Sequence, residues 1–460
     1  MISKFIGRQK ELSLLEDEWN KTNGRLIILY GRRRIGKTRL ITEFTSNKNG
    51  IFYFAEDTSP HIQINRLQEK IAEFTRDEIL RNLDIKDWDQ LFGYLTRNCP
   101  TERFYLVIDE FSYLIKSDKS ILSTLQKYWD TALSSSNIYI ILSGSMLGLM
   151  SEMVLSHASP LYGRRSRDLL LEGLSFSDSK EFLNMPFQET LETYMILGGV
   201  PEYLLKASEY TDITNFVEKE FLDKFGYFHR EPYFIISQEF KELKTYFSIL
   251  NSIAFGNTKP TDIANFVGMD ARKIYPYLEN LIRLGFIKRQ VSILGTQKKG
   301  IYLIKDPVFD FWFNFVSKYK EEIEKGVFKL RNDDMTRFFG KRFEIFVQQE
   351  IIHHLIPDFQ KIGRWWHKGE EIDVLALNEV QKEIAFFECK WQEVDRKRSE
   401  HILADLKRKA ALIKWHNSER RELYGIIGKK INAKKKLREM GYLVFDLEVF
   451  MFLSKFDVKG

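Results

Sequence analysis

The segment from Gly31 to Thr38 (GRRRIGKT) constrains the fold more than any other part of the chain. It directly follows Arg25–Tyr30 (RLIILY), a short apolar run typical of a strand buried in a parallel sheet. A strand, a glycine-containing loop and a helix form the setting that a phosphate-binding loop (P-loop) requires. The sequence therefore predicts an α/β fold with a parallel sheet and a nucleotide-binding loop at its edge.

Each residue type in this loop has a distinct task. The glycines let backbone N–H groups surround the phosphates, and the positive N-terminus of the following helix attracts them. Lys37 is expected to reach the β- and γ-phosphates, and the Thr38 hydroxyl is expected to coordinate Mg²⁺. ATP and Mg²⁺ are therefore the predicted cofactors. The residues of this segment expected at the nucleotide are Gly31, Arg34, Ile35, Gly36, Lys37, Thr38 and Arg39.

Two acids follow a second apolar run, Phe104–Ile108. A P-loop enzyme that hydrolyses its nucleotide needs an acid in the Mg²⁺ shell at a neighbouring strand end, and then a carboxylate that orients water. We therefore predict Asp109 as the Mg²⁺ ligand and Glu110 as the catalytic carboxylate. The alternative for Glu110 is a surface acid at the end of a strand.

Polar residues also follow a third apolar run, Ile138–Leu142. Either Ser143 or Ser145 could contact the γ-phosphate from this position. A plain turn is the alternative.

The segment Phe5–Leu12 (FIGRQKEL) resembles the Gly-Arg-x-x-Glu box of the archaeal ATPase family and its AAA+-type origin-recognition and STAND relatives. The resemblance implies that Gly7 and Arg8 lie against the adenine. It also assigns to the nucleotide site Ser145 or Ser143 on a sensor strand, Arg164 or Arg165 as a polar contact, and Pro201 in a Gly-x-Pro lid turn over Gly198–Pro201. Without the family, these last positions are a basic pair and a helix stop.

The chain of 460 residues is long enough for about three domains, since single cores usually stop growing near roughly 100 to 200 residues. The expected order is an ATPase core (1–171), a helical lid (172–235), a winged helix (236–317), a connector (318–334) and a C-terminal α/β domain (335–460). The aromatic residues of the lid are explained better by core packing than by stacking on a ligand.

The middle region resembles a winged helix, in which two helices joined at Gly268 precede a strand near 285–289. Thr261 or Asp262 is expected to cap the first helix. DNA contact is predicted for Arg272 and Lys273 near the start of the second helix and for Lys288, Arg289, Lys298 and Lys299 around the wing. The alternative is a winged helix that packs only against the nucleotide domain or a partner protein.

The C-terminal domain carries a second set of acids. Asp373 lies early in one predicted strand, and Glu388-x-Lys390 ends the next, with the period-2 alternation placing Glu388 and Lys390 on one face. Asp373 and Glu388 could hold Mg²⁺ for phosphodiester hydrolysis while Lys390 positions or activates water, and Glu344 from the preceding helix could add a fourth group. A solvated strand edge is the alternative.

This pattern resembles the PD-(D/E)xK nuclease superfamily of restriction enzymes and archaeal junction resolvases, with Ile372-Asp373 in place of Pro-Asp. The resemblance implies a restriction-endonuclease-like fold and assigns catalysis to Asp373, Glu388 and Lys390. The combined layout also resembles the archaeal ATPases that carry a C-terminal domain of unassigned function.

The net charge of +6 is unevenly distributed, with basic residues concentrated in the C-terminal fifth. This asymmetry favours a polyanionic partner, and DNA is expected; solvated helix faces are the alternative. No stretch approaches the roughly 20 apolar residues of a membrane span, so we expect a cytoplasmic protein without membrane contact. A homo-oligomer or a partner protein remains open.

Two functions fit these features. The first is an ATP-regulated DNA-processing enzyme, with a metal-dependent nuclease site. The second is a signalling or scaffold ATPase whose nuclease-like domain is catalytically silent and only binds a partner.

Overall fold

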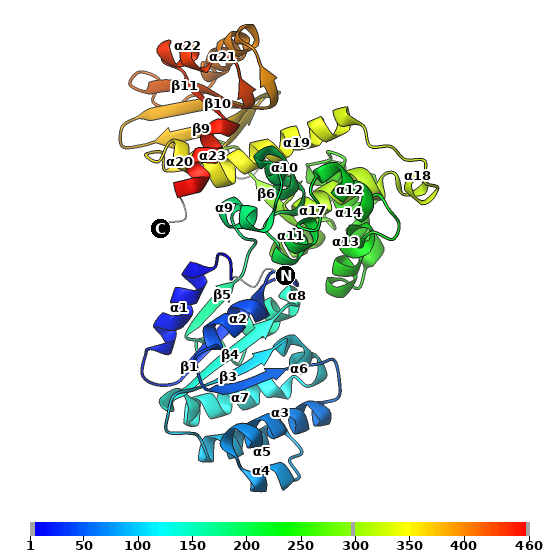
Figure 1. Cartoon of the computed structure of the whole chain (residues 1–460), viewed down its shortest axis with the longest axis vertical. Coiled ribbons are helices and arrows are strands. Elements are labelled where there is room, and N and C mark those ends of the chain that lie inside the picture. The colour runs from blue at the N-terminus through cyan, green and yellow to red at the C-terminus, as the bar shows by residue number, and fades with distance from the viewer. Residues whose placement is uncertain (1–4, 296–299, 457–460) are drawn as a thin grey trace. The chain divides into compact units, whose positions relative to one another are not determined.

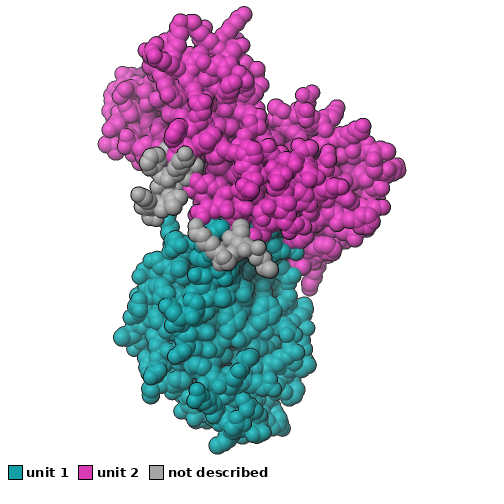
Figure 2. Space-filling view, in the orientation of Figure 1, with its two compact units in different colours: residues 1–174, 200–203 teal, residues 175–199, 204–460 magenta. Residues whose placement is uncertain are grey.

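The computed structural model describes residues 5–295 and 300–456 (Figure 1). The chain divides into two compact units (Figure 2). Unit 1 comprises Met1–Leu174 and Val200–Tyr203, and unit 2 comprises Ser175–Gly199 and Leu204–Gly460. Each unit is described by itself below.

Unit 1 is built on a five-stranded sheet in the order β2-β3-β4-β1-β5, and all neighbouring strands run parallel. The strands are β1 Arg25–Tyr30, β2 Gly50–Phe54, β3 Phe104–Asp109, β4 Ile138–Gly144 and β5 Arg167–Leu170. Every residue of the central strand β4 is buried, as expected for a parallel sheet covered on both faces. The predicted parallel α/β fold is confirmed.

Alternation along β1 sends its side chains to two separate cores. Ile27 and Leu29 pack with α1 and α2, whereas Leu26 and Ile28 pack with the helices of the other face. The helices on the first face are α1 Gln9–Trp19 and α2 Lys37–Thr45; on the second they are α3 Pro60–Thr75, α5 Trp88–Arg97, α6 Phe111–Ser117 and α7 Ser120–Thr131. The shorter helices are α4 Glu78–Asn82, α8 Leu147–Met150 and the π-helical segment η2 Ser151–Leu155.

Unit 2 begins with a helical region packed around aromatic side chains. Phe221 and Phe228 stack with ring centroids 4.6 Å apart, and Phe216 contacts both. The helices are α9 Phe176–Ser179, α10 Phe187–Leu197, α11 Pro201–Ala207, α12 Ile213–Glu220 and α13 Tyr227–Glu239, and the first three residues of α11 belong to unit 1. The buried rings agree with a core role for these aromatics rather than a ligand-stacking role.

Three helices and a hairpin come next. They are α14 Leu243–Ala254, α15 Pro260–Val267, α16 Tyr275–Arg283 and the antiparallel strands β6 Ile287–Gln290 and β7 Ile301–Ile304. Gly268 ends α15 with φ 70°, a conformation that glycine adopts without strain. The predicted cap is wrong, because Lys259 is the N-cap residue and no side chain caps α15. The order of elements supports the proposal of a winged helix.

A long helical segment then leads into the last sheet. It consists of α17 Pro307–Phe311, η5 Trp312–Ser317, α18 Lys320–Glu324, α19 Asn332–Phe346, η6 Val347–Ile351 and α20 Ile352–Leu355. The predicted connector therefore includes α18 and the first turn of α19. The division of unit 2 into lid, winged helix, connector and nuclease-like domain stays a proposal.

The last sheet has five strands in the order β12-β11-β10-β9-β8. The strands are β8 Lys361–His367, β9 Glu370–Asn378, β10 Glu383–Val394, β11 Arg421–Ile431 and β12 Leu443–Asp446. β8, β9 and β10 pair antiparallel, whereas β10, β11 and β12 pair parallel. This mixed sheet is compatible with the expected restriction-endonuclease-like fold.

Helices cover this sheet on both faces. Leu403 and Leu406 of α21 (Arg396–Ala410) and Leu437 of α22 (Lys434–Glu439) pack into the core of one face. On the other face, Phe343 of α19 contacts Trp391 of β10 and Phe450 of α23 (Leu447–Phe456).

Candidate functional site

The predicted phosphate loop joins β1 to α2. Gly36 has φ 92° and is the N-cap residue of α2. A Cβ atom on Gly31 would lie 2.7 Å from the carbonyl oxygen of Leu171, so no other residue fits there without displacing the backbone. Both glycines are thus required by the local geometry, one by its dihedral angle and the other by close packing.

Lys37 is held across the loop. Its side chain is buried, and its Nζ donates hydrogen bonds to the carbonyls of Gly31 at 2.9 Å and Arg32 at 3.1 Å. Burial lowers the pKa of Lys37, while the carboxylates of Glu110 and Asp109 oppose that shift. The ammonium group is therefore directed at the loop and close to both predicted acids.

Thr38 and Asp109 meet at the carboxyl edge of the sheet. The Thr38 hydroxyl donates a hydrogen bond of 2.6 Å to Oδ2 of Asp109, whose side chain is fully buried. Oδ1 of Asp109 accepts from the backbone N–H of Glu110 at 3.0 Å. A hydroxyl and a carboxylate side by side are the hard oxygen donors that Mg²⁺ prefers, so these residues fit the predicted ion.

Glu110 lies immediately after β3 and begins α6 with a left-handed backbone, φ 54°. Its Oε2 accepts a hydrogen bond of 2.6 Å from the hydroxyl of Ser145, the residue after β4. The hydroxyl of Ser143 is buried and has no hydrogen-bond partner among the described residues. Of the two serines considered from the sequence, Ser145 is the one in contact with Glu110.

Arg8 links three segments of unit 1. Gly7 and Arg8 both have positive φ, at 66° and 64°. The Arg8 guanidinium donates to the carbonyls of Ile35, in the phosphate loop, at 3.1 Å and Glu172 at 2.5 Å. The contact of Gly7 and Arg8 with the adenine, which the resemblance implied, stays a prediction. The hydrogen bonds of Arg8 brace the phosphate loop against neighbouring segments.

Pro201 lies near the phosphate loop. Its Cγ is 3.7 Å from the position that a Cβ atom on Gly36 would take. Arg34, in the loop with φ 70°, forms an ion pair of 3.6 Å with Glu202. Arg39 points along the exposed side of α2, where it lies 3.3 Å from Glu43. The Gly-x-Pro turn is therefore beside the loop, whereas Arg39 is paired on the helix surface.

The predicted nucleotide contact by Arg164 is wrong for this unit. Arg164 forms a bidentate ion pair with Asp130 at the end of α7, with both distances 2.8 Å. Because β5 pairs with β1 in parallel, with Arg167 opposite Ile27, Arg164 lies at the amino edge of the sheet. The phosphate loop lies at the carboxyl edge of the sheet. Arg165 also precedes β5, so it lies at the amino edge together with Arg164.

In unit 2, three predicted catalytic side chains converge on the last sheet. Glu388 and Lys390 lie on one face of β10, with Lys390 Nζ 2.7 Å from Glu388 Oε1. The same Nζ is 3.9 Å from Oδ2 of Asp373, which accepts from the backbone N–H of Cys389 at 2.9 Å. The strand pairing thus assembles two carboxylates around one ammonium.

Burial sets the charge state of this cluster. Burial, and then the neighbouring carboxylate of Glu388, raise the pKa of Asp373 to about 6. Burial and then Asp373 raise the pKa of Glu344 to about 8. Burial opposes the charge of Lys390, yet Glu388 and Asp373 together raise its pKa. The site is acidic, poorly solvated and electrostatically suited to a cation.

Lys409 was missed by the sequence reasoning. It lies on α21 with only 9% of its surface exposed, and its Nζ is 3.9 Å from Oε2 of Glu388. Its closer partner is Asp405, one turn earlier, at 2.9 Å. The spacing Asp405-x-x-x-Lys409 within a basic helix was the signal available in the sequence.

The predicted metal ligand set is not assembled in full. Among residues 5–295 and 300–456, no group of three or more His, Cys, Asp or Glu side chains could hold a metal ion. Glu344 instead lies 4.0 Å from the guanidinium of Arg364. Glu388 Oε2, however, is buried without a hydrogen-bond partner, so Glu388 and Asp373 fit a cation as a pair. The assignment of Glu344 as a third ligand stays a prediction, since Asp373 is among the groups that raise its pKa.

The predicted DNA contacts differ in exposure. Arg272 and Lys273 are exposed but precede α16 instead of lying on it, and Arg289 is exposed on β6. Lys288 is half-buried on β6, where burial and then the charges of Arg342 and Lys305 lower its pKa to about 8. A phosphate contact by Lys288 stays a prediction. Lys298 and Lys299 lie outside the described residues.

Several basic residues of the C-terminal fifth are paired with acids. Arg396 pairs with Glu400, Arg408 with Glu370, Lys430 with Glu393 and Lys434 with Asp446, at 2.7, 2.7, 3.2 and 2.8 Å. Part of the charge concentrated along the sequence is thus held in ion pairs in the fold.

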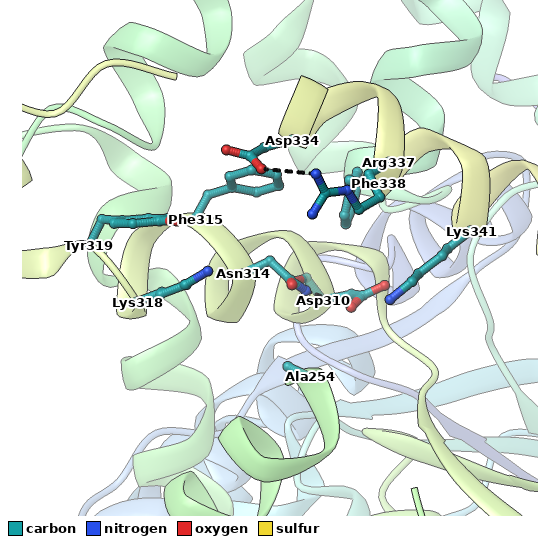
Figure 3. A pocket seen from close by; sticks show the side chains of 10 residues that line it. All are labelled: Ala254, Asp310, Asn314, Phe315, Lys318, Tyr319, Asp334, Arg337, Phe338 and Lys341. Atoms are coloured by element: carbon teal, nitrogen blue, oxygen red, sulfur yellow. Dashed lines mark hydrogen bonds and ion pairs between the residues drawn. The ribbon is translucent and has the colours of Figure 1, made fainter. Parts of the chain in front are cut away.

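A small cavity of about 120 Å³ lies between η5 and α19 (Figure 3). It contains charges of both signs that lie near one another, including Arg337 and Asp334 at 3.9 Å. Burial raises the pKa of Asp310, while Arg342, 3.6 Å away, opposes that shift. These paired charges favour a structural role at the start of α19.

No helix in the described ranges is both long and apolar enough to cross a membrane.

Known proteins share both halves of this architecture. The family described as "ATPase domain predominantly from Archaea" matches residues 5–207, and the family described as "Archaea bacterial proteins of unknown function" matches residues 312–402. An uncharacterized protein of Methanocaldococcus jannaschii is 34% identical over 459 residues, which cover 97% of this chain and 100% of that protein. An uncharacterized ATP-binding protein of the same organism is 55% identical over 47 residues, covering 10% of this chain and 80% of its own length.

Among solved structures, the Walker-type ATPase PABY2304 of Pyrococcus abyssi is similar, with a TM-score of 0.50. It is 22% identical, and the match covers 67% of this chain and 96% of that chain. At this identity the likeness supports the fold.

Proposed function

Since this chain belongs to the archaeal ATPase family, we propose that it hydrolyses ATP at the phosphate loop and uses the nucleotide state to control a DNA-cutting site in unit 2. The observation that carries the catalytic half of this proposal is the convergence of Asp373, Glu388 and Lys390, with Lys390 Nζ 2.7 Å from Glu388 and 3.9 Å from Asp373.

For ATP hydrolysis, each residue of the loop edge has a role in the proposal. Lys37 stabilises negative charge on the transferred phosphoryl group. Glu110 accepts a hydrogen bond from the attacking water and orients it, while Ser145 holds the Glu110 carboxylate in place. Thr38 and Asp109 would hold Mg²⁺, which neutralises charge on the β- and γ-phosphates when bound.

For DNA cleavage, Asp373 and Glu388 would hold a divalent cation, which supplies Lewis-acid stabilisation of the phosphate when bound. Lys390 orients the attacking water and stabilises the charge that develops on the phosphate oxygens. Because Asp373 has a pKa of about 6, the cation competes with a proton for this carboxylate. Cleavage should therefore weaken as the pH falls below about 6.

The test uses purified full-length protein with labelled linear, supercoiled and branched DNA in Mg²⁺ or Mn²⁺, with and without ATP. Asp373→Ala and Lys390→Ala are compared with wild type. Lys430→Ala is the matched control, because Lys430 is a lysine of the neighbouring strand β11 that pairs with Glu393 at the surface. Cleavage that disappears in the two site variants and persists in the control supports the proposal.

Coupling between the two sites is tested with Glu110→Gln, which should bind ATP without hydrolysing it. A change in DNA cleavage between wild type and Glu110→Gln at saturating ATP supports nucleotide control. Equal cleavage with and without ATP in both proteins contradicts it.

A signalling or scaffold ATPase is the second candidate. It is favoured by the finding that no group of three or more His, Cys, Asp or Glu side chains among the described residues could hold a metal ion. This candidate predicts ATP hydrolysis without DNA cleavage, together with an assembly state that depends on nucleotide. Sedimentation with ADP or with a non-hydrolysable ATP analogue distinguishes the two functions.

A further inference from the structure

Two neighbouring hollows in unit 2 share the side chain of Tyr233, on α13. The first, of about 600 Å³, is bounded by residues of α13, η5 and α18 and the segment before α13. The second, of about 660 Å³, is bounded by α13 and the start of α14. Both volumes fall in the range of roughly 300 to 1,000 Å³ typical of sites for small organic groups. Neither hollow contains a residue that the sequence assigned to a site.

Aromatic rings are unusually exposed at this place. Tyr233 is 48% exposed and Phe234 is 52% exposed, although such side chains are normally buried. The Tyr233 ring lies 5.5 Å from Phe247, and Phe247 lies 5.9 Å from Trp312 on η5. Phe247 and Trp312 therefore support the ring of Tyr233 from one side, and a planar group can stack on its exposed face.

Cations surround these rings. The two hollows are lined by five basic side chains, Lys224, Arg230, Lys241, Lys244 and Lys320, and by two acidic ones, Glu242 and Glu324. Glu242 accepts a hydrogen bond of 2.8 Å from Tyr277, and Glu324 lies 3.8 Å from Lys320. The surface has an excess of positive charge next to exposed aromatic faces.

Four of these cations differ from those of the C-terminal sheet. Within the described part of the chain, Lys224, Arg230, Lys241 and Lys244 take part in no ion pair, whereas Arg408 is paired with Glu370. Uncompensated charge attracts an anionic partner more strongly than charge already paired within the fold. These four charges are therefore available to an anionic partner.

We infer that this surface, formed by α13, the start of α14 and the η5–α18 segment, binds a single strand of nucleic acid. Bases would stack on Tyr233 and Phe234, and the strand's phosphates would contact the surrounding cations. This inference rests on the proposed action on DNA and specifies which form of DNA unit 2 holds.

Two other partners fit less well. A duplex presents its phosphates but keeps its base faces stacked inside, so the exposed rings would remain unused. The core of a protein interface is typically depleted of charged residues and of lysine in particular, in contrast to the five cations here. A second copy of the chain on this surface is therefore the outcome that the test must exclude.

The experiment measures fluorescence anisotropy of a labelled single-stranded oligonucleotide and of the matching duplex, with full-length protein in EDTA to prevent cleavage. Wild type should bind the single strand more tightly than the duplex. Because base stacking contributes roughly 1–3 kcal/mol per base, Tyr233→Ala and Phe234→Ala should each weaken single-strand binding by about fivefold or more. Tyr233→Trp should restore it, since a ring face remains.

The matched aromatic controls are Phe255→Ala and Phe266→Ala, which remove exposed rings (44% and 47%) just after α14 and on α15, at residues that line neither hollow. They should leave binding unchanged. Each phosphate contact to a single strand contributes roughly 0.7 to the slope of log affinity against log salt concentration. The double variant K241Q/K244Q removes two such contacts and should therefore reduce that slope by about 1.4. Lys86→Gln together with Lys116→Gln, on unit 1, is the charge control.

Equal binding by wild type and the aromatic variants overturns the inference, and so does preference for the duplex. A change of sedimentation in Tyr233→Ala without a change in strand binding also overturns it, because it assigns the surface to a second copy. If the protein binds single strands through Tyr233 but cuts no DNA, the proposed nuclease activity is refuted and this inference stands. Cleavage lost in Lys390→Ala together with unaffected binding in Tyr233→Ala refutes this inference alone.

Discussion

The Ser145 hydroxyl donates a hydrogen bond of 2.6 Å to Oε2 of Glu110, so two strand ends of one sheet hold the predicted catalytic carboxylate between them. Glu110 has a left-handed backbone, and its side chain depends on this bond for its orientation. Removing the bond should disorder the carboxylate without removing it.

Ser145→Ala should therefore lower kcat for ATP hydrolysis by about tenfold, the effect expected from losing one hydrogen bond of about 1–1.5 kcal/mol. ATP affinity should stay within about twofold of wild type. Ser143→Ala is the control, because the Ser143 hydroxyl has no partner in the described chain. Equal loss of kcat in both variants would contradict a positioning role for Ser145.

Arg8→Ala should weaken both stability and ATP binding. The side chain of Arg8 is only 8% exposed, and its loss leaves the carbonyls of Ile35 and Glu172 without their charged donor. Hydrogen bonds to charged groups contribute about 1.5–3 kcal/mol each, so we expect Tm to fall by several degrees and the Kd for ATP to rise about tenfold.

Arg8→Lys is the informative comparison. A lysine keeps the charge but cannot reach two carbonyls with one planar group, so it should recover little of either loss. Full recovery by lysine would show that charge alone matters at this position.

Lys288→Met should raise the thermal stability of the protein at pH 7. Burial, Arg342 and Lys305 lower the pKa of Lys288 from an ordinary value of 10.5 to about 8. Between pH 8 and 10.5 the unfolded chain therefore binds more protons than the folded chain, so the free energy of unfolding rises with pH in this range. The destabilisation caused by the buried charge is fully present below pH 8 and is lost as the pH rises to 10.5. Calorimetry should show a Tm increase of about 2 °C or more at pH 7 that shrinks across that window.

The same variant tests the sequence-based prediction of a DNA contact. If Lys288, which is half-buried on β6, makes no phosphate contact, DNA affinity should be unchanged in Lys288→Met. A drop in affinity with an altered salt dependence would support the predicted contact.

Lys409→Gln should reduce DNA cleavage by about tenfold if the proposed nuclease is active. Lys409 lies 3.9 Å from Glu388 and is anchored by Asp405, so its loss frees the Glu388 carboxylate to move. Lys397→Gln, at an exposed position on the same helix, is the control. A shift of the metal concentration needed for half-maximal cleavage would distinguish positioning of Glu388 from general loss of structure.

The sequence by itself determined the features that are local along the chain. A glycine loop after an apolar strand, and an acid pair after another, specify the phosphate loop and the parallel sheet because their chemistry lies within a few consecutive residues. Period-2 alternation likewise placed Glu388 and Lys390 together, since both belong to one strand.

Only the tertiary structure decided which distant residues meet. Arg8 reaches Ile35 and Glu172, Ser145 rather than Ser143 reaches Glu110, and Lys409 approaches Glu388 because strand order and helix packing bring them together. Arg164 illustrates the same limit: its family match was local, but the parallel pairing of β5 with β1 puts it at the opposite edge of the sheet. The sequence also did not decide which basic residues stay unpaired, because an ion pair depends on which acid the fold places beside each base.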